Sequence, residues 1–244
     1  MSGPPAPPSD LADAWVVIPV YNEARVLAQT LAEVTGTFSH VVCVDDASTD
    51  GGGRLAAGFP GVRVVRHPVN LGQGAALQTG IDYVLRDPGA ARLVTFDADG
   101  QHRVGDAAAL VRLLGSPAAD GRPAQVALGS RFAARAGGGA DQAGRLRRAL
   151  LKAATAYTNL SVGLRLTDTH NGLRAMTREV AAGLRIRQNG MAHASEILEQ
   201  IAAAGHAYVE HPVEIDYSPY SRAKGQPALN AVNILTDLLS RGPR

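Results

Sequence analysis

The sequence predicts a single α/β domain built on a mostly parallel β-sheet flanked by helices. Three short apolar runs have the length and composition of buried strands, and each ends in a polar, turn-forming loop. A helical pattern follows the first run. A chain of 244 residues with 45% hydrophobic residues is long enough for one such domain with a full core.

The first predicted strand covers residues 14–20 and leads into Tyr21-Asn22-Glu23. The residues that follow are spaced for one face of a helix, namely Val26, Leu27, Thr30, Leu31 and Val34. Residues 1–13 are expected to form a disordered leader, because the first ten contain four prolines and no apolar segment. We assign residues 14–226 to the domain and residues 227–244 to a C-terminal amphipathic helix and tail. The apolar stripe of that helix favours packing on the domain, with a membrane or a partner helix as the alternative.

Two further strands are predicted at residues 40–44 and 93–96. The first of them leads into the acidic loop 45–51, and the second leads into Asp97-Ala98-Asp99-Gly100-Gln101-His102. In an open parallel sheet, ligands bind beyond the carboxyl ends of the strands. The three loops are therefore expected to converge on one cleft.

The loop after the third strand predicts a metal site. Asp97, Asp99 and Gln101 alternate along the chain, so in extended geometry they would point to one side. Mg²⁺ and Mn²⁺ prefer oxygen ligands and are often held by one or two carboxylates together with substrate phosphates. The alternative is an Asp-Gly turn whose acids bond to their own backbone.

Composition narrows the class of protein. A formal net charge of +2, 5% aromatic residues and no recognisable readout module argue against a nucleic-acid partner. The chain has one cysteine, Cys43, so an internal disulfide is excluded and the reducing cytoplasm is the expected compartment. No apolar run has the length of a membrane span, which makes any membrane role peripheral.

Four segments in order resemble the signatures of family 2 glycosyltransferases, which have the Rossmann-like GT-A fold. They are residues 17–23 (VIPVYNE), 44–50 (VDDASTD), 70–76 (NLGQGAA) and 97–102 (DADGQH). Within that family the chain most resembles the polyprenol-phosphate sugar synthases of the dolichol-phosphate mannose synthase type, over roughly residues 14–225. The resemblance implies a nucleoside-diphosphate-sugar donor, with a UDP-sugar favoured over GDP-mannose. It also implies a polyprenyl phosphate acceptor, which would place the chain at the inner face of the cell membrane. Because the chain lacks bilayer segments of its own, a small membrane protein is a possible partner.

The resemblance also assigns roles to individual residues. Asp97 and Asp99 would hold Mg²⁺ or Mn²⁺ with Gln101 and act as catalytic residues. The family pattern often has lysine where this chain has Gln73, which removes one possible phosphate contact. The residues expected to bind the donor in this part of the chain are Pro19, Tyr21, Glu23, Asp45, Asp46, Gly72 and Ala98.

Further along the chain, a basic segment and a polar loop are expected to handle phosphates. Arg131 and Arg145 would clasp donor or acceptor phosphates in a bidentate fork, with Arg147 or Arg148 as alternatives to Arg145. Arg222 and Lys224 would belong to a lid over the donor diphosphate. The structural alternative for the basic segment is a solvated charged face.

The acceptor decides whether a base is needed. A phosphate is already anionic at neutral pH, whereas a sugar hydroxyl needs a general base. Asp168, expected near the acceptor and counted among the catalytic residues with Arg131, would be that base, or else Glu196. The competing functions are a family 2 enzyme acting on a saccharide or other hydroxyl, and an inactive nucleotide-sugar-binding subunit. The intact Asp97, Asp99 and Gln101 argue against the inactive subunit.

Overall fold

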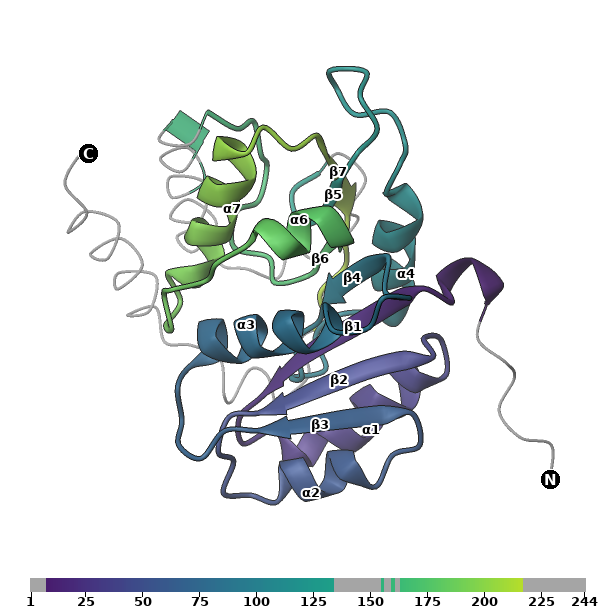
Figure 1. Cartoon of the computed structure of the whole chain (residues 1–244), viewed down its shortest axis with the longest axis vertical. Coiled ribbons are helices and arrows are strands. Elements are labelled where there is room, and N and C mark those ends of the chain that lie inside the picture. The colour runs from purple at the N-terminus through teal and green to yellow at the C-terminus, as the bar shows by residue number, and fades with distance from the viewer. Residues whose placement is uncertain (1–7, 134–154, 156–158, 161–162, 217–244) are drawn as a thin grey trace.

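The computed structural model describes residues 8–133, 155, 159–160 and 163–216 of the chain. Within this part, seven strands form one sheet in the order β3-β2-β1-β4-β6-β5-β7 (Figure 1). All neighbouring pairs are parallel except those that involve β6, which is antiparallel to both β4 and β5. The strands are β1 (Ala14–Val20), β2 (His40–Asp45), β3 (Val62–Arg66), β4 (Arg92–Thr95), β5 (Val126–Ser130), β6 (Arg174–Thr177) and β7 (Tyr208–Pro212).

Helices cover both faces of the sheet. The short helix η1 with α1, α2 and α4 contributes to one buried apolar cluster, and α3, α6 and α7 contribute to the other. The helices are η1 (Ser9–Leu11), α1 (Ala24–Thr35), α2 (Gly52–Ala57), α3 (Gln73–Val84), α4 (Val104–Leu113), α6 (Arg178–Gly183) and α7 (His193–Ala203). The domain is therefore a three-layer sandwich with the sheet in the middle.

Strand β1 shows why both faces are buried. Val16 and Ile18 belong to one apolar cluster, whereas Trp15 and Val17 belong to the other. Successive side chains of a strand point to opposite faces, so a central strand with apolar residues throughout needs cover on both sides. Helix α3 comes especially close, because a side chain at Gly80 would collide with Val17. The start of α3 is thereby brought near the carboxyl ends of β1 and β2.

The predicted mostly parallel α/β fold is confirmed, and so are its first three strands. The strand predicted at 14–20 is β1, and the strands predicted at 40–44 and 93–96 are shifted at their ends by no more than one residue. Helix α1 buries Leu27, Leu31 and Val34 as its spacing predicts.

Residues 9–13 are not part of a disordered leader, contrary to the prediction. Residues Ser9–Leu11 form a 3₁₀-helix, and Leu11 is fully buried in the core. Asp13, which we assigned to a disordered leader, forms an ion pair with Arg92. Residues 1–7 and the predicted carboxyl-terminal helix lie outside the described residues.

Two further properties bear on function. Cys43 is a free, buried thiol inside β2, and burial raises its pKa to about 12, so it is inert as a nucleophile. Among the described residues, no helix combines the length and apolar character needed to cross a bilayer.

Candidate active site

The loops after β1, β2 and β4 meet at the carboxyl edge of the sheet, as the sequence predicts (Figure 1). The backbone N–H of Asn22, after β1, donates to Ser48 Oγ, after β2, at 3.1 Å. The loop after β4 is tied to α1, because Thr30 Oγ1 donates to the carbonyl of Ala98 at 3.4 Å. Ala98 is itself buried, so its side chain packs inward while its backbone joins the loop to the helix.

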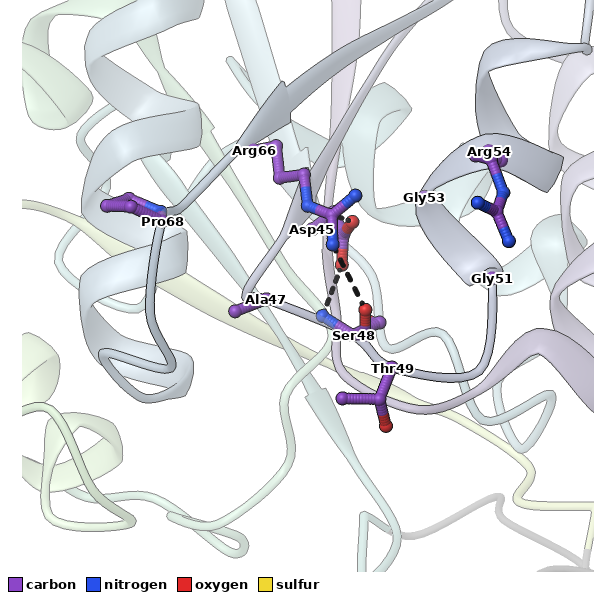
Figure 2. Close-up of a pocket in the computed structure, with 9 residues that line it drawn as sticks. All are labelled: Asp45, Ala47, Ser48, Thr49, Gly51, Gly53, Arg54, Arg66 and Pro68. Carbon is purple, nitrogen blue, oxygen red and sulfur yellow. Dashed lines mark hydrogen bonds and ion pairs between the residues drawn. The ribbon is translucent and has the colours of Figure 1, made fainter.

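A cavity of about 400 Å³ opens beside Asp45. Figure 2 shows Arg66 reaching over Asp45 from the end of β3, with Gly51 and Gly53 on the opposite side. The volume lies in the range of small-molecule sites. The lining residues are Asp45, Ala47, Ser48, Thr49, Gly51, Gly53, Arg54, Arg66 and Pro68.

Asp45 has one carboxylate oxygen that the fold leaves without a hydrogen bond. Its Oδ1 accepts from the backbone N–H of Ser48 at 2.9 Å. Its buried Oδ2 lies 3.4 Å from Arg66 Nε but accepts no hydrogen bond among the described residues. Any side chain at Gly53 would collide with this oxygen. A buried acceptor without a donor is costly, and a nucleoside N–H or O–H would remove that cost.

Asp46 faces the start of α3 instead. Its side chain is almost wholly buried, and its Oδ1 accepts from the backbone N–H of Leu71 at 2.8 Å. The same oxygen lies 2.7 Å from His67 Nδ1, and Oδ2 accepts from the N–H of Gly72 at 2.8 Å. Both oxygens are thus engaged by protein groups, and a contact of Asp46 with the nucleoside stays a prediction.

Gly72 also has a role in the fold. Its φ of 96° favours glycine, and a side chain there would collide with the carbonyl of Asn189. The backbone N–H of Gly74, two residues further on, donates to the same carbonyl at 3.0 Å. With its own N–H bonded to Asp46, Gly72 lets α3 begin against the loop before α7.

The other predicted nucleoside contacts lie at the same edge. Pro19 is half-buried near the end of β1, and Tyr21 is 47% exposed just beyond it. Glu23 precedes α1, and its carbonyl accepts from the N–H of Leu27 at 2.9 Å. The exposed ring of Tyr21 is accessible to a ligand, which is compatible with the predicted contact.

Asp97 is held on both carboxylate oxygens. Gln73 Nε2 donates to Oδ1 at 3.0 Å, and His102 Nε2 lies 3.0 Å from Oδ2. Gly172 packs so closely that a side chain there would collide with the carboxylate. Burial alone would raise the pKa of Asp97, but the hydrogen bond and charge of His102, with smaller contributions from His193 and other cationic groups, outweigh burial and lower it.

Asp99 and Gln101 form a second part of the acidic turn. The backbone N–H of Gln101 donates to Asp99 Oδ1 at 3.1 Å, and its Nε2 donates to Oδ2 at 2.7 Å. Strand β4 ends at Thr95, so the alternation that we used to place these residues on one side belongs to a turn and not to a strand. Gln101 nevertheless lies beside the acids, and its role as a metal ligand stays a prediction.

The chemistry of the acidic turn fits Mg²⁺ or Mn²⁺. Burial, and next the negative charge of Asp97, raise the pKa of Asp99 to about 6. A divalent cation would relieve the cost of holding these two charges together. No cluster of three or more His, Cys, Asp or Glu ligands occurs in the described ranges, so water and the phosphates of a donor would complete the coordination.

Arg131 and Asp168, predicted separately, form one ion pair in which Asp168 is buried and Arg131 partly buried. Arg131 Nε donates to Asp168 Oδ2 at 2.7 Å and Nη2 donates to Oδ1 at 2.8 Å. Burial would raise the pKa of Asp168, but the charge of Arg131 and its hydrogen bonds outweigh burial and hold the pKa below its usual value. A carboxylate with a lowered pKa is a weak general base, so Asp168 orients Arg131 better than it accepts a proton.

Glu196 is engaged elsewhere. It lies on α7, and its Oε2 accepts from the backbone N–H groups of Arg187 at 3.0 Å and of Gln188 at 2.8 Å. These bonds fix the loop that precedes α7. The structure therefore gives Glu196 a loop-holding role, and its role as a base stays a prediction.

A functional candidate that sequence reasoning missed is Arg174 on β6. It is only 4% exposed, and its Nη2 donates to the carbonyls of Thr169 at 3.4 Å and Ala194 at 3.3 Å. Burial lowers its pKa to about 10, while the charges of Asp97 and Asp168 oppose that shift. An arginine between the apolar residues Leu173 and Ala175 was the available signal in the sequence. Three other predicted residues, Arg145, Arg222 and Lys224, lie outside the described residues.

The fold and site together define a class of protein. A mostly parallel sheet with an acidic turn and a cavity of about 400 Å³ at its carboxyl edge is the arrangement of GT-A glycosyltransferases. The sequence model described as "Glycosyl transferase family 2" matches residues 15–184, and the chain belongs to that family. It is a glycosyltransferase.

Relatives and solved structures agree with this class. The polyprenol monophosphomannose synthase of Mycolicibacterium smegmatis is 36% identical over 68% of this chain and 62% of its own length. The undecaprenyl-phosphate mannosyltransferase of Micrococcus luteus is 32% identical over 81% of each chain. Glucosyl-3-phosphoglycerate synthase from Mycobacterium tuberculosis, solved with Mn²⁺, UDP and phosphoglyceric acid, shares the fold with a TM-score of 0.62. That match has 18% identity and covers 92% of this chain and 78% of the other.

Proposed function

We propose that this chain transfers a hexose from a nucleoside-diphosphate sugar to polyprenyl phosphate, with inversion at the anomeric carbon and with Mg²⁺ or Mn²⁺. The names of the two mannosyl-transferring relatives support the acceptor. The UDP complex of the structural neighbour supports UDP as the first donor base to test, with GDP-mannose second. Because the acceptor is a membrane lipid, we propose that the chain acts at the inner face of the membrane. Neither relative's name mentions a partner protein, and a membrane partner forms no part of the proposal.

One observation carries the preference for a phosphate acceptor. The two side chains that the sequence puts forward as bases are both engaged, Asp168 by Arg131 and Glu196 by the backbone of Arg187 and Gln188. A sugar hydroxyl would need one of them free to take its proton. An acceptor phosphate already carries a negative charge and needs no base.

Each part of the site would have a separate role in this reaction. The cavity beside Asp45 would take the nucleoside, and Asp97 and Asp99 would hold the cation on the donor phosphates. The bound cation supplies neutralisation of the charge that develops on the departing diphosphate. An acceptor oxygen bonds to the anomeric carbon as the bond to the diphosphate breaks on the opposite face. Arg131, oriented by Asp168, is placed to steady a phosphate.

The test is sugar transfer to a short-chain polyprenyl phosphate. Radiolabelled UDP-hexoses and GDP-mannose are supplied in turn with Mn²⁺ or Mg²⁺, and EDTA serves as the control. The proposal expects a labelled lipid that requires the metal and is lost in Asp99→Asn. The matched control is Asp120→Asn, because in the described part of the chain Asp120 pairs with the nearby Arg122 at the surface.

Other outcomes identify the competing functions. Transfer to saccharides but not to lipid phosphate would replace the acceptor with a hydroxyl. Donor binding without transfer to any acceptor would favour a nucleotide-sugar-binding subunit. A lipid product in EDTA would overturn the metal requirement alone.

A further inference from the structure

The orientation of Asp97 depends on a residue at the start of α3. Gln73 is the first residue of that helix, and its Nε2 donates to Asp97 Oδ1 at 3.0 Å. With His102 on the other oxygen and Gly172 packed against the carboxylate, Asp97 has little freedom to turn. A ligating carboxylate that is fixed in advance does not lose that freedom when a cation binds.

The position of Gln73 is in turn set by Asp46. The N–H groups of Leu71 and Gly72, the two residues before the helix, both donate to the Asp46 carboxylate at 2.8 Å. The first N–H groups of a helix region have no partner within the helix, so an outside acceptor decides where the helix starts. Asp46 therefore fixes the point from which the Gln73 side chain reaches Asp97.

Asp46 is itself held rigidly. It is 2% exposed, and its Oδ1 lies 2.7 Å from His67 Nδ1. The other ring nitrogen of His67 lies 3.0 Å from Oγ1 of Thr79 in the middle of α3. Hydrogen bonds thus connect His67 to Asp46, and Asp46 to the two residues before α3. The backbone then leads to Gln73, whose side chain donates to Asp97.

We propose that Asp46 and Gln73 are positioning residues of the metal site. Asp46 fixes the start of α3, and the side chain of Gln73 at that start holds the Asp97 carboxylate in place. The affinity for the cation is therefore set in part by Asp46, which contacts neither the cation nor the donor. This inference rests on the proposed metal-dependent function.

The first test replaces Gln73 with methionine, which keeps the length of the side chain and removes its donor. The Mn²⁺ affinity of the full chain is measured by electron paramagnetic resonance with saturating UDP, or with GDP if UDP does not bind. We expect Gln73→Met to bind Mn²⁺ about tenfold more weakly, which is a typical loss of affinity when a hydrogen bond to a metal ligand is removed. The matched control is Gln29→Met, because Gln29 Nε2 donates to Glu33 Oε1 at the same 3.0 Å on the exposed side of α1.

The second test separates positioning from nucleoside contact. Asp46→Asn replaces one acceptor oxygen with an N–H₂ group that no longer accepts from Leu71 or Gly72. If Asp46 positions the metal site, the variant should bind Mn²⁺ more weakly. Its affinity for the nucleotide in EDTA, measured by calorimetry, should be unchanged. Loss of nucleotide affinity in EDTA with Mn²⁺ affinity retained would make Asp46 a nucleoside contact and overturn its positioning role.

Two further results would overturn the inference, and they are distinguishable. Equal Mn²⁺ affinity in wild type, Gln73→Met and Gln29→Met would overturn the positioning role while leaving the metal site in place. No Mn²⁺ binding by the wild-type chain with either nucleotide would overturn the metal-dependent function and this inference with it. If Asp46→Asn does not fold, Gln73→Met still decides between these results.

Discussion

Replacing Gly172 with alanine should impair catalysis by moving Asp97 without changing any polar group. The added Cβ would lie 3.0 Å from both Cγ and Oδ1 of Asp97, and nearer still to Oδ2, whereas ordinary van der Waals contact begins at 3.4 Å. Gly172 does not have a positive φ, so the backbone itself accepts alanine. Relief of the overlap requires the carboxylate to retreat by about 1 Å, a displacement that can lower a rate by about 100-fold.

The assay is the turnover number for metal-dependent sugar transfer at saturating donor and acceptor. Overpacking of this kind costs about 1–3 kcal/mol, less than the unfolding free energy of about 5–15 kcal/mol of a typical domain, so the variant should fold. Circular dichroism checks this. The control is Gly105→Ala in α4, where an added Cβ would meet nothing within 4 Å. A folded Gly172→Ala variant with the activity of the control would refute the placement of Asp97 in the site.

Three further changes test other parts of the site. Because the pKa of Asp99 is raised to about 6, protons compete with the cation, and Mn²⁺ affinity should decrease as the pH falls from about 7 to about 5; a flat profile in metal titrations would contradict this. Asp168→Ala removes the carboxylate that accepts two hydrogen bonds from the Arg131 side chain and should lower the unfolding free energy in urea by about 3 kcal/mol. The lowered pKa of Asp168 means that this contribution is present above its ordinary pKa of 3.8 and is lost as the pH falls below it, so wild type and variant should converge in acid. Gly53→Ala would push against Asp45 Oδ2 and should weaken nucleotide binding in EDTA by about tenfold or more, as calorimetry would show; unchanged binding would place the nucleoside elsewhere.

The parts of the fold that depend on local pattern were predictable from the sequence. The apolar runs that became β1, β2 and β4 are short and bounded by turn residues, and α1 repeats its apolar residues at helical spacing. The acidic loops then follow at the strand ends, where a parallel sheet collects its ligands. Each of these inferences needs only residues that are neighbours in the chain.

The pairing of distant residues was not predictable in the same way. Arg131 and Asp168 were both identified, but their ion pair depends on how two loops approach across the sheet. The adjacent acids Asp45 and Asp46 were assigned the same role, although neighbours at a strand end point to opposite sides. The alternation of side chains was enough to predict that only one of them faces the cavity. The partner that Asp46 meets at the start of α3 became visible only in three dimensions.

The place of β6 in the sheet has a consequence for synthesis of the chain. Strand β4 pairs with β1 on one side, but its other side pairs with β6, whose residues follow on the order of 80 positions later in the sequence. Until those residues leave the ribosome, the nascent protein carries an open strand edge directly before the acidic turn. Open edges invite pairing with other chains, so fragments that stop between β4 and β6 should aggregate. Strand β4 is therefore protected on both sides only after β6 has been synthesised.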